Sequence, residues 1–115
     1  MDITYKYWDI YKASPGTKDF LKLIKMWDKL RADLWQYIQP YDAIITPVCT
    51  QTAHVYADTS PEIFPYTLTY SLTGWPCVTV RVGTSEETNL PINLQIVAKP
   101  FHEETCLLIA SELEK

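Results

Sequence analysis

The sequence predicts an α/β fold in which helices flank a mixed β-sheet. Three patterns in the 115 residues indicate it: a long helical periodicity at 18–39, two alternating stretches at 77–82 and 91–98, and a shorter helical pattern at 103–114. Helices repeat their apolar side chains every three or four residues, whereas strands alternate them, so the two periods separate the elements. We expect these elements to pack around one modest core, with a folded surface of about 6,400 Å².

The strongest pattern is the amphipathic helix at 18–39. The apolar side chains that share one face are Phe20, Leu23, Ile24, Trp27, Leu30, Leu34, Trp35 and Ile38. We expect Ser14 or Thr17 to cap its N-terminus and Pro40 to end it. Arg31 falls within the apolar face, where either its methylenes pack while its guanidinium reaches a carboxylate, or it forms a buried ion pair with another segment.

The remaining segments predict strands and a terminal helix. Residues 41–47 are a short apolar run bounded by prolines, which favours a buried strand of a parallel or mixed sheet. The stretches 77–82 and 91–98 are separated by a polar turn of roughly seven residues and therefore predict a β-hairpin. Residues 66–74 are compatible with a strand or a helical turn. Residues 103–114 predict a helix with acidic side chains in its first turn, where they favour the helix dipole.

Charge and cysteine content exclude several classes of function. The net charge is −4, so long-range attraction to phosphate backbones is weak and nucleic acid is not an expected partner. Cys49, Cys77 and Cys106 form no CxxC motif, which argues against a disulfide framework and a zinc ribbon. Three buried free thiols in a reducing, cytoplasmic compartment fit better. No stretch approaches the roughly 18 apolar residues of a membrane span, so no such span is expected.

A search for catalytic motifs finds none that is self-sufficient. The three glycines, Gly16, Gly74 and Gly83, lie far apart, which excludes a Gly-rich phosphate loop. No nucleophile elbow of the type G-x-S-x-G occurs. The sequence His102-Glu103-Glu104 lacks metal-ligand spacing, so we expect no metal and no cofactor. The sequence thus assigns no catalytic residue.

Four segments, in order, resemble the C-terminal portion of the amidase-signature amidohydrolases. They are YDAIITP at 41–47, YTLTYSLTGWP at 66–76, NLPINLQIVA at 89–98 and the helical stretch at 103–114. The family patterns are a YD-hydrophobic-hydrophobic-TP strand, an fN-x-tG-x-P segment, a GLPVGVQLVG strand and a final helix. Asn89, Asn93 and Ser71 depart from these patterns, the first at a position that is usually Gly. The resemblance makes residues 18–115 the C-terminal segment of an incomplete amidase domain, and leaves 1–17 as an aromatic N-terminal arm.

The resemblance implies hydrolysis of an amide C–N bond by a Ser–cis-Ser–Lys triad, with backbone N–H groups of a Gly/Ser-rich loop holding the oxyanion. In the family, the triad and this loop lie upstream of the four segments. The resemblance therefore places no catalytic residue in this chain, which we expect to be inactive alone. Its expected partners are the missing N-terminal part of the amidase and a small-molecule amide substrate.

The substrate-pocket candidates are Phe64, Leu68, Thr46 and Tyr70. In the branch resembling fatty-acid amide hydrolases, the positions matching Phe64 and Leu68 line the acyl channel, which would suit a hydrophobic acyl or aryl group. Thr46 ends a predicted strand, and open α/β sheets place ligands at such ends. The alternative is that Phe64, Leu68 and Tyr70 only pack the sheet.

Other functions remain open. The chain could be a non-catalytic interaction module that uses the 18–39 helix and the hairpin, or a fragment of a tRNA-dependent amidotransferase A-type subunit with a polar glutamine pocket. A small enzyme with a Cys or Ser nucleophile is a further alternative, which slow alkylation of Cys77 would exclude. The amidase hypothesis predicts uncovered apolar surface, which would favour homo-oligomers. The side chains expected to form it are Val78, Val80, Val82, Leu107 and Leu108.

Overall fold

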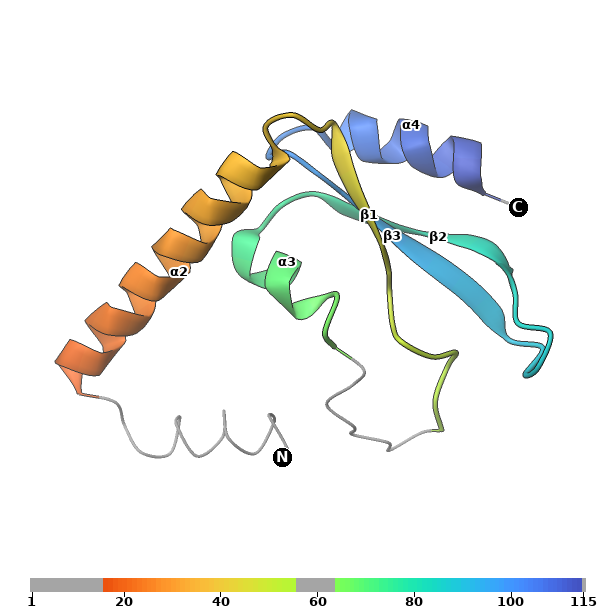
Figure 1. Cartoon of the computed structure of the whole chain (residues 1–115), viewed down its shortest axis with the longest axis horizontal. Coiled ribbons are helices and arrows are strands. Elements are labelled where there is room, and N and C mark those ends of the chain that lie inside the picture. Colours follow the sequence, from red (N-terminus) through yellow and green to blue (C-terminus); the bar gives the residue numbers. More distant parts are fainter. Residues whose placement is uncertain (1–15, 56–63, 115) are drawn as a thin grey trace.

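A three-stranded antiparallel sheet connects the helices of the fold (Figure 1). The computed structural model describes residues 16–55 and 64–114, so most of the predicted arm at 1–17 lies outside it. The described elements are α2 (Thr17–Ile38), β1 (Ala43–Pro47), α3 (Leu68–Thr73), β2 (Cys77–Thr84), β3 (Pro91–Ala98) and α4 (Glu103–Leu113). The strand order is β1-β3-β2, and the predicted α/β class is confirmed.

Strands β2 and β3 form the predicted hairpin. Cys77 lies opposite Val97, and the register shifts between Arg81 and Gly83, which marks a β-bulge. In the loop that joins the strands, Asn89 has φ 55° and is therefore in the left-handed region. Asparagine tolerates this conformation better than other residues with a side chain, which explains how it can replace the glycine of the family pattern.

One face of the sheet packs against α4. The side chains buried together there are Val80, Ile96, Ala98, Cys106 and Ala110, with Val78 and Val82 partly buried beside them. The expectation that the β2 valines lie uncovered is therefore wrong, because α4 packs on the face to which alternation directs them. Leu107 and Leu108 lie off the buried stripe of α4 and are exposed as predicted.

The opposite face holds a second cluster at one end of the sheet. Ile38, Trp75 and Val97 are buried there, and Leu34, Ile44 and Tyr70 pack around them. Trp75 contacts Trp35 edge-on, with ring centroids 6.4 Å apart. Strand β1 pairs with β3 in antiparallel orientation and is only half-buried, since it lies at the edge of the described sheet. The predicted strand exists, but neither its full burial nor a parallel neighbour is found in the part described.

The ambiguous segment before Trp75 is helical. It forms α3, which ends at Gly74, and Gly74 has φ 69°. Glycine adopts this left-handed conformation without steric cost, so it is suited to close the helix.

Helix α2 is confirmed, but most of its apolar face is uncovered. Gly16 occupies the N-cap position, so Thr17 begins the helix instead of capping it, and Ser14 lies outside the described residues. Only Ile38 at the opposite end is buried, whereas Phe20 is 54% and Leu23 48% exposed. Figure 1 shows α2 extending away from the sheet towards its N-terminal end.

Two side-chain contacts shape the middle of α2. Trp27 Nε1 donates a hydrogen bond to the carbonyl oxygen of Leu72, which ties α2 to α3. Arg31 forms an ion pair with Asp28 of the same helix, and its guanidinium lies 5.4 Å from the centre of the Trp27 ring. Both partners of the ion pair are exposed, so the buried ion pair with another segment is not formed.

The molecule exposes more surface than a compact chain of its mass. Its accessible area is 8913 Å², whereas about 6,400 Å² is expected from the mass. None of the helices within 16–55 and 64–114 is long and apolar enough to cross a membrane.

Two isoleucines of β3 test how the core is distributed. Ile96 is fully buried and Ile92 is 43% exposed. We expect Ile96→Ala to lower the free energy of unfolding by about 2–5 kcal/mol, because it leaves a cavity between sheet and α4. Ile92→Ala, the matched control, should cost less than about 1 kcal/mol. Denaturant unfolding measures both, and equal losses would contradict this assignment of the core.

Candidate functional site

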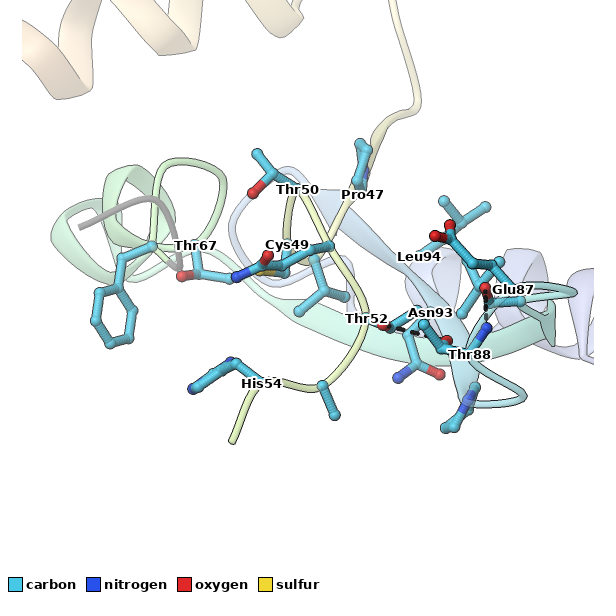
Figure 2. A pocket seen from close by; sticks show the side chains of 17 residues that line it. Pro47, Cys49, Thr50, Thr52, His54, Thr67, Glu87, Thr88, Asn93 and Leu94 are labelled. Carbon is cyan, nitrogen blue, oxygen red and sulfur yellow. Dashed lines mark hydrogen bonds between the residues drawn. The ribbon is translucent and has the colours of Figure 1, made fainter. Parts of the chain in front are cut away.

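A cavity of about 870 Å³ lies at the end of the sheet where strands β1 and β2 finish. Its walls are the loop after β1 (47–54), the turn before α3 with Phe64 and Thr67, and the hairpin loop with the start of β3. Figure 2 shows the loop after β1 between Thr67 on one side and Glu87 and Thr88 on the other. Segments distant in the sequence therefore meet at one place.

The lining of the cavity combines apolar and polar side chains, and Val48, Phe64 and Leu94 are among the apolar ones. Its polar side chains are Thr50, Gln51, Thr52, His54, Thr67, Ser85, Glu87, Thr88 and Asn93. The Thr88 hydroxyl donates to Thr52 Oγ1 over 3.3 Å, which joins the hairpin loop to the loop after β1. Thr88 N–H donates to Ser85 Oγ over 3.3 Å and so stabilises the hairpin loop itself. Such a lining can bind a ligand that offers several hydrogen-bonding groups.

Of the four residues proposed from the sequence, only Phe64 lines this cavity. Leu68 is exposed on α3, and Tyr70 packs in the second cluster beside Trp75. Desolvation raises the pKa of the Tyr70 hydroxyl, with smaller contributions from Tyr37 and Cys77. The hydroxyl of Thr46 accepts a hydrogen bond from Gln95. The four side chains therefore do not converge on one pocket among the described residues.

Sequence reasoning missed the residues of the hairpin loop, above all Glu87 and Thr88. The strand order of the structure, which the sequence does not give, explains their place at the cavity. Strands β1 and β2 both pair antiparallel with β3, so they run in the same direction and end at the same edge of the sheet. The rule that ligands bind at strand ends therefore applies to the loop after β2 as much as to Thr46.

The three thiols differ in exposure. Cys106 is buried, Cys49 is half-buried at the cavity and Cys77 is exposed. The expectation of three buried thiols is therefore correct for Cys106 alone. Cys77 is exposed because it begins an edge strand on the face away from α4. Desolvation raises the pKa of both the Cys77 and the Cys106 thiols. A raised pKa keeps a thiol protonated and unreactive, which argues against Cys77 as a nucleophile.

The cavity residues offer binding groups more than catalytic ones. No hydrogen bond joins His54 to Cys49 or Ser85 in the part of the chain that the structure describes, so a nucleophile–base pair is not formed there. The same part contains no group of three His, Cys, Asp or Glu side chains that could hold a metal ion. This arrangement can hold a ligand through hydrogen bonds and apolar contacts.

Comparisons with known proteins give a consistent result. A family model described as Amidase matches residues 9–107. The glutamyl-tRNA(Gln) amidotransferase A-subunit of Fusobacterium nucleatum is 33% identical over 112 residues, which cover 91% of this chain and 23% of the relative. The corresponding protein of Hyphomonas neptunium is 30% identical over 112 residues, 90% of this chain and 23% of the relative.

A solved structure agrees with these relatives. The crystal structure of the glutamyl-tRNA(Gln) amidotransferase A-subunit from Thermotoga maritima matches with a TM-score of 0.68 and 26% identity, over 93% of this chain and 24% of that chain. This chain therefore spans about a quarter of the length of the relatives named here. Since these relatives are amidotransferase subunits, they give no support to the fatty-acid-amide-hydrolase-like branch.

The thiols provide a direct test of the local structure. With iodoacetamide at about pH 8, we expect Cys106 to remain unlabelled in the native chain. Cys77 should react more slowly than a free cysteine peptide, because its raised pKa leaves a smaller fraction of thiolate. Mass spectrometry of labelled peptides measures both rates, with Cys77→Ser as the control. Reaction of Cys77 faster than the free peptide would contradict this interpretation and favour a nucleophilic role.

Proposed function

The chain belongs to the amidase family, and on that premise we propose that it acts as the C-terminal quarter of an amidase-family enzyme. Residues 18–115 would complete the fold and form part of the wall of the substrate cavity, and residues 1–17 would precede this segment as an arm. The Ser–cis-Ser–Lys triad that hydrolyses the amide would lie in the upstream part. The chain alone would then be inactive.

The uncovered apolar face of α2 is the observation that supports this proposal most. Phe20, Leu23 and Trp27 are exposed along a helix whose opposite face carries lysines. Exposed apolar surface of this extent marks a surface that binds another protein segment. The upstream part of an amidase domain is a fitting occupant, since this chain spans about a quarter of its relatives. Without that part, the same face would favour homo-oligomers.

For the substrate, we favour a polar amide over a fatty acyl amide. Thr52, His54 and Asn93 line the cavity with hydrogen-bonding groups, which suits the glutamine pocket expected of an amidotransferase A-type subunit. The relatives named above point the same way. The apolar lining residues, such as Val48, Phe64 and Leu94, would suit a hydrophobic acyl or aryl amide; the amidotransferase relatives decide our preference for the polar amide. A cytoplasmic location is part of the proposal and is supported by three free thiols.

Replacement of the matching quarter of the Thermotoga maritima protein by this chain tests the proposal. The chimera should hydrolyse glutamine, measured as ammonia release, whereas the Thermotoga protein truncated before that quarter should not. Hydrolysis of an aryl amide, measured in parallel, distinguishes the two substrate classes. A chimera that is folded and monodisperse but cleaves neither amide would contradict the proposal and favour a non-catalytic interaction module.

Two single substitutions in α2 test whether its apolar face docks against the upstream part of the enzyme. Leu23→Glu places a charge on the apolar face and should abolish activity of the chimera, because a buried unpaired carboxylate opposes docking. Lys25→Glu changes the net charge by more than Leu23→Glu does, but Lys25 lies on the opposite, polar face. The activity of this variant should therefore stay within about twofold of that of the parent chimera. Equal loss in both variants would show that α2 does not dock through this face.

A further inference from the structure

The side chain of Gln95 connects three segments near the cavity. It lies in β3, is 3% exposed, and is the buried polar side chain of the described core. Its Nε2 donates to the carbonyl oxygen of Tyr66 over 3.1 Å and to the hydroxyl oxygen of Thr46 over 3.4 Å. One amide group thus bonds to the end of β1 and to the turn before α3.

The surroundings of the Gln95 side chain indicate that its role is hydrogen bonding and not hydrophobic packing. Burying an amide in an apolar core costs free energy unless its hydrogen bonds are made. Val97, two residues along the same face of β3, is apolar and fully buried, so an apolar side chain suits this face of the strand. A glutamine here adds little to hydrophobic packing. Its contribution is instead a hydrogen-bond donor, which the central strand holds within reach of Thr46 and Tyr66.

The Tyr66 carbonyl belongs to a turn whose other hydrogen bonds, among the described residues, are its own and those to α3. Thr67 N–H and Leu68 N–H both donate to the Phe64 carbonyl oxygen, over 3.3 Å and 3.1 Å, so residues 64–68 form one closed turn. Phe64 and Thr67 of this turn line the cavity. Displacement of the Tyr66 carbonyl would therefore move that cavity wall.

We propose that Gln95 is the positioning residue of the cavity: its side-chain amide sets the distance between the sheet and the wall formed by Phe64 and Thr67. The effect on an amide substrate rests on the proposed function above, whereas the tether itself does not. Gln95 is not a lining residue, so it acts on the ligand only through the turn.

Hydrogen exchange of this chain tests the tether. Gln95→Met conserves volume and removes the donor, so amides within 64–70 should exchange about fivefold faster or more, since one local hydrogen bond is lost. Exchange in β2 and α4 should not change. Thr79→Val, directly opposite Gln95 on β2, is the matched control and should alter neither region. Gln95→Leu gives the same readout if the methionine variant does not fold.

The possible results separate positioning from general stabilisation. Unchanged exchange at 64–70, or a uniform rise in every element, would overturn the proposal. In the active chimera, Gln95→Met should raise KM for the amide at least several-fold with kcat changed little, because a displaced wall weakens binding. An inactive parent chimera would refute the proposed function, while the exchange result would still decide the tether.

Discussion

Burial of residues 95–98 of β3 on both faces is the constraint on which the rest of the structure depends. β3 is the only described strand with a neighbour on each side, so it fixes the registers of β1 and β2. Strand alternation then directs Ile96 and Ala98 towards α4, and Gln95 and Val97 towards the second cluster. A shift by one residue would exchange the two faces and place Gln95 against Cys106, which makes the register strongly specified.

The small size of this core explains why α2 is so poorly covered. Val97 and Trp75 occupy only one end of the second face, and they contact only the C-terminal part of α2 around Leu34 and Ile38. The first turns of the helix extend away from the sheet (Figure 1), and about half of the surface of Phe20 and Leu23 is exposed. The exposed Phe20 and Leu23 therefore reflect the limited extent of the sheet.

Sequence periodicity predicted α2, the hairpin and α4, because each buries a face whose period is visible without knowledge of its partner. It could not predict that α4 covers Val80 while Phe20 stays uncovered, since a pattern shows which face is apolar and not what lies against it. The six-residue helix α3 was not distinguished from a strand, because Leu68, Tyr70 and Leu72 alternate as in a strand while Leu68 and Leu72 also have the i, i+4 spacing of a helix. Phe64 was found at the cavity, but Glu87 and Thr88 required the strand order.

Strand order also explains how the cavity and the core are linked. Because β1 and β2 end at the same edge, loops that are far apart in sequence form adjacent walls there. Loops tolerate polar side chains, so hydrogen-bonding groups join apolar ones at this end of the sheet, whereas residues 96–98 are apolar and fully buried. Gln95 lies at the boundary between the two regions, one residue from Ile96 and bonded to Tyr66. A buried residue can therefore influence ligand binding without contacting the ligand, because the nearest wall is bonded to the strand that is paired on both sides.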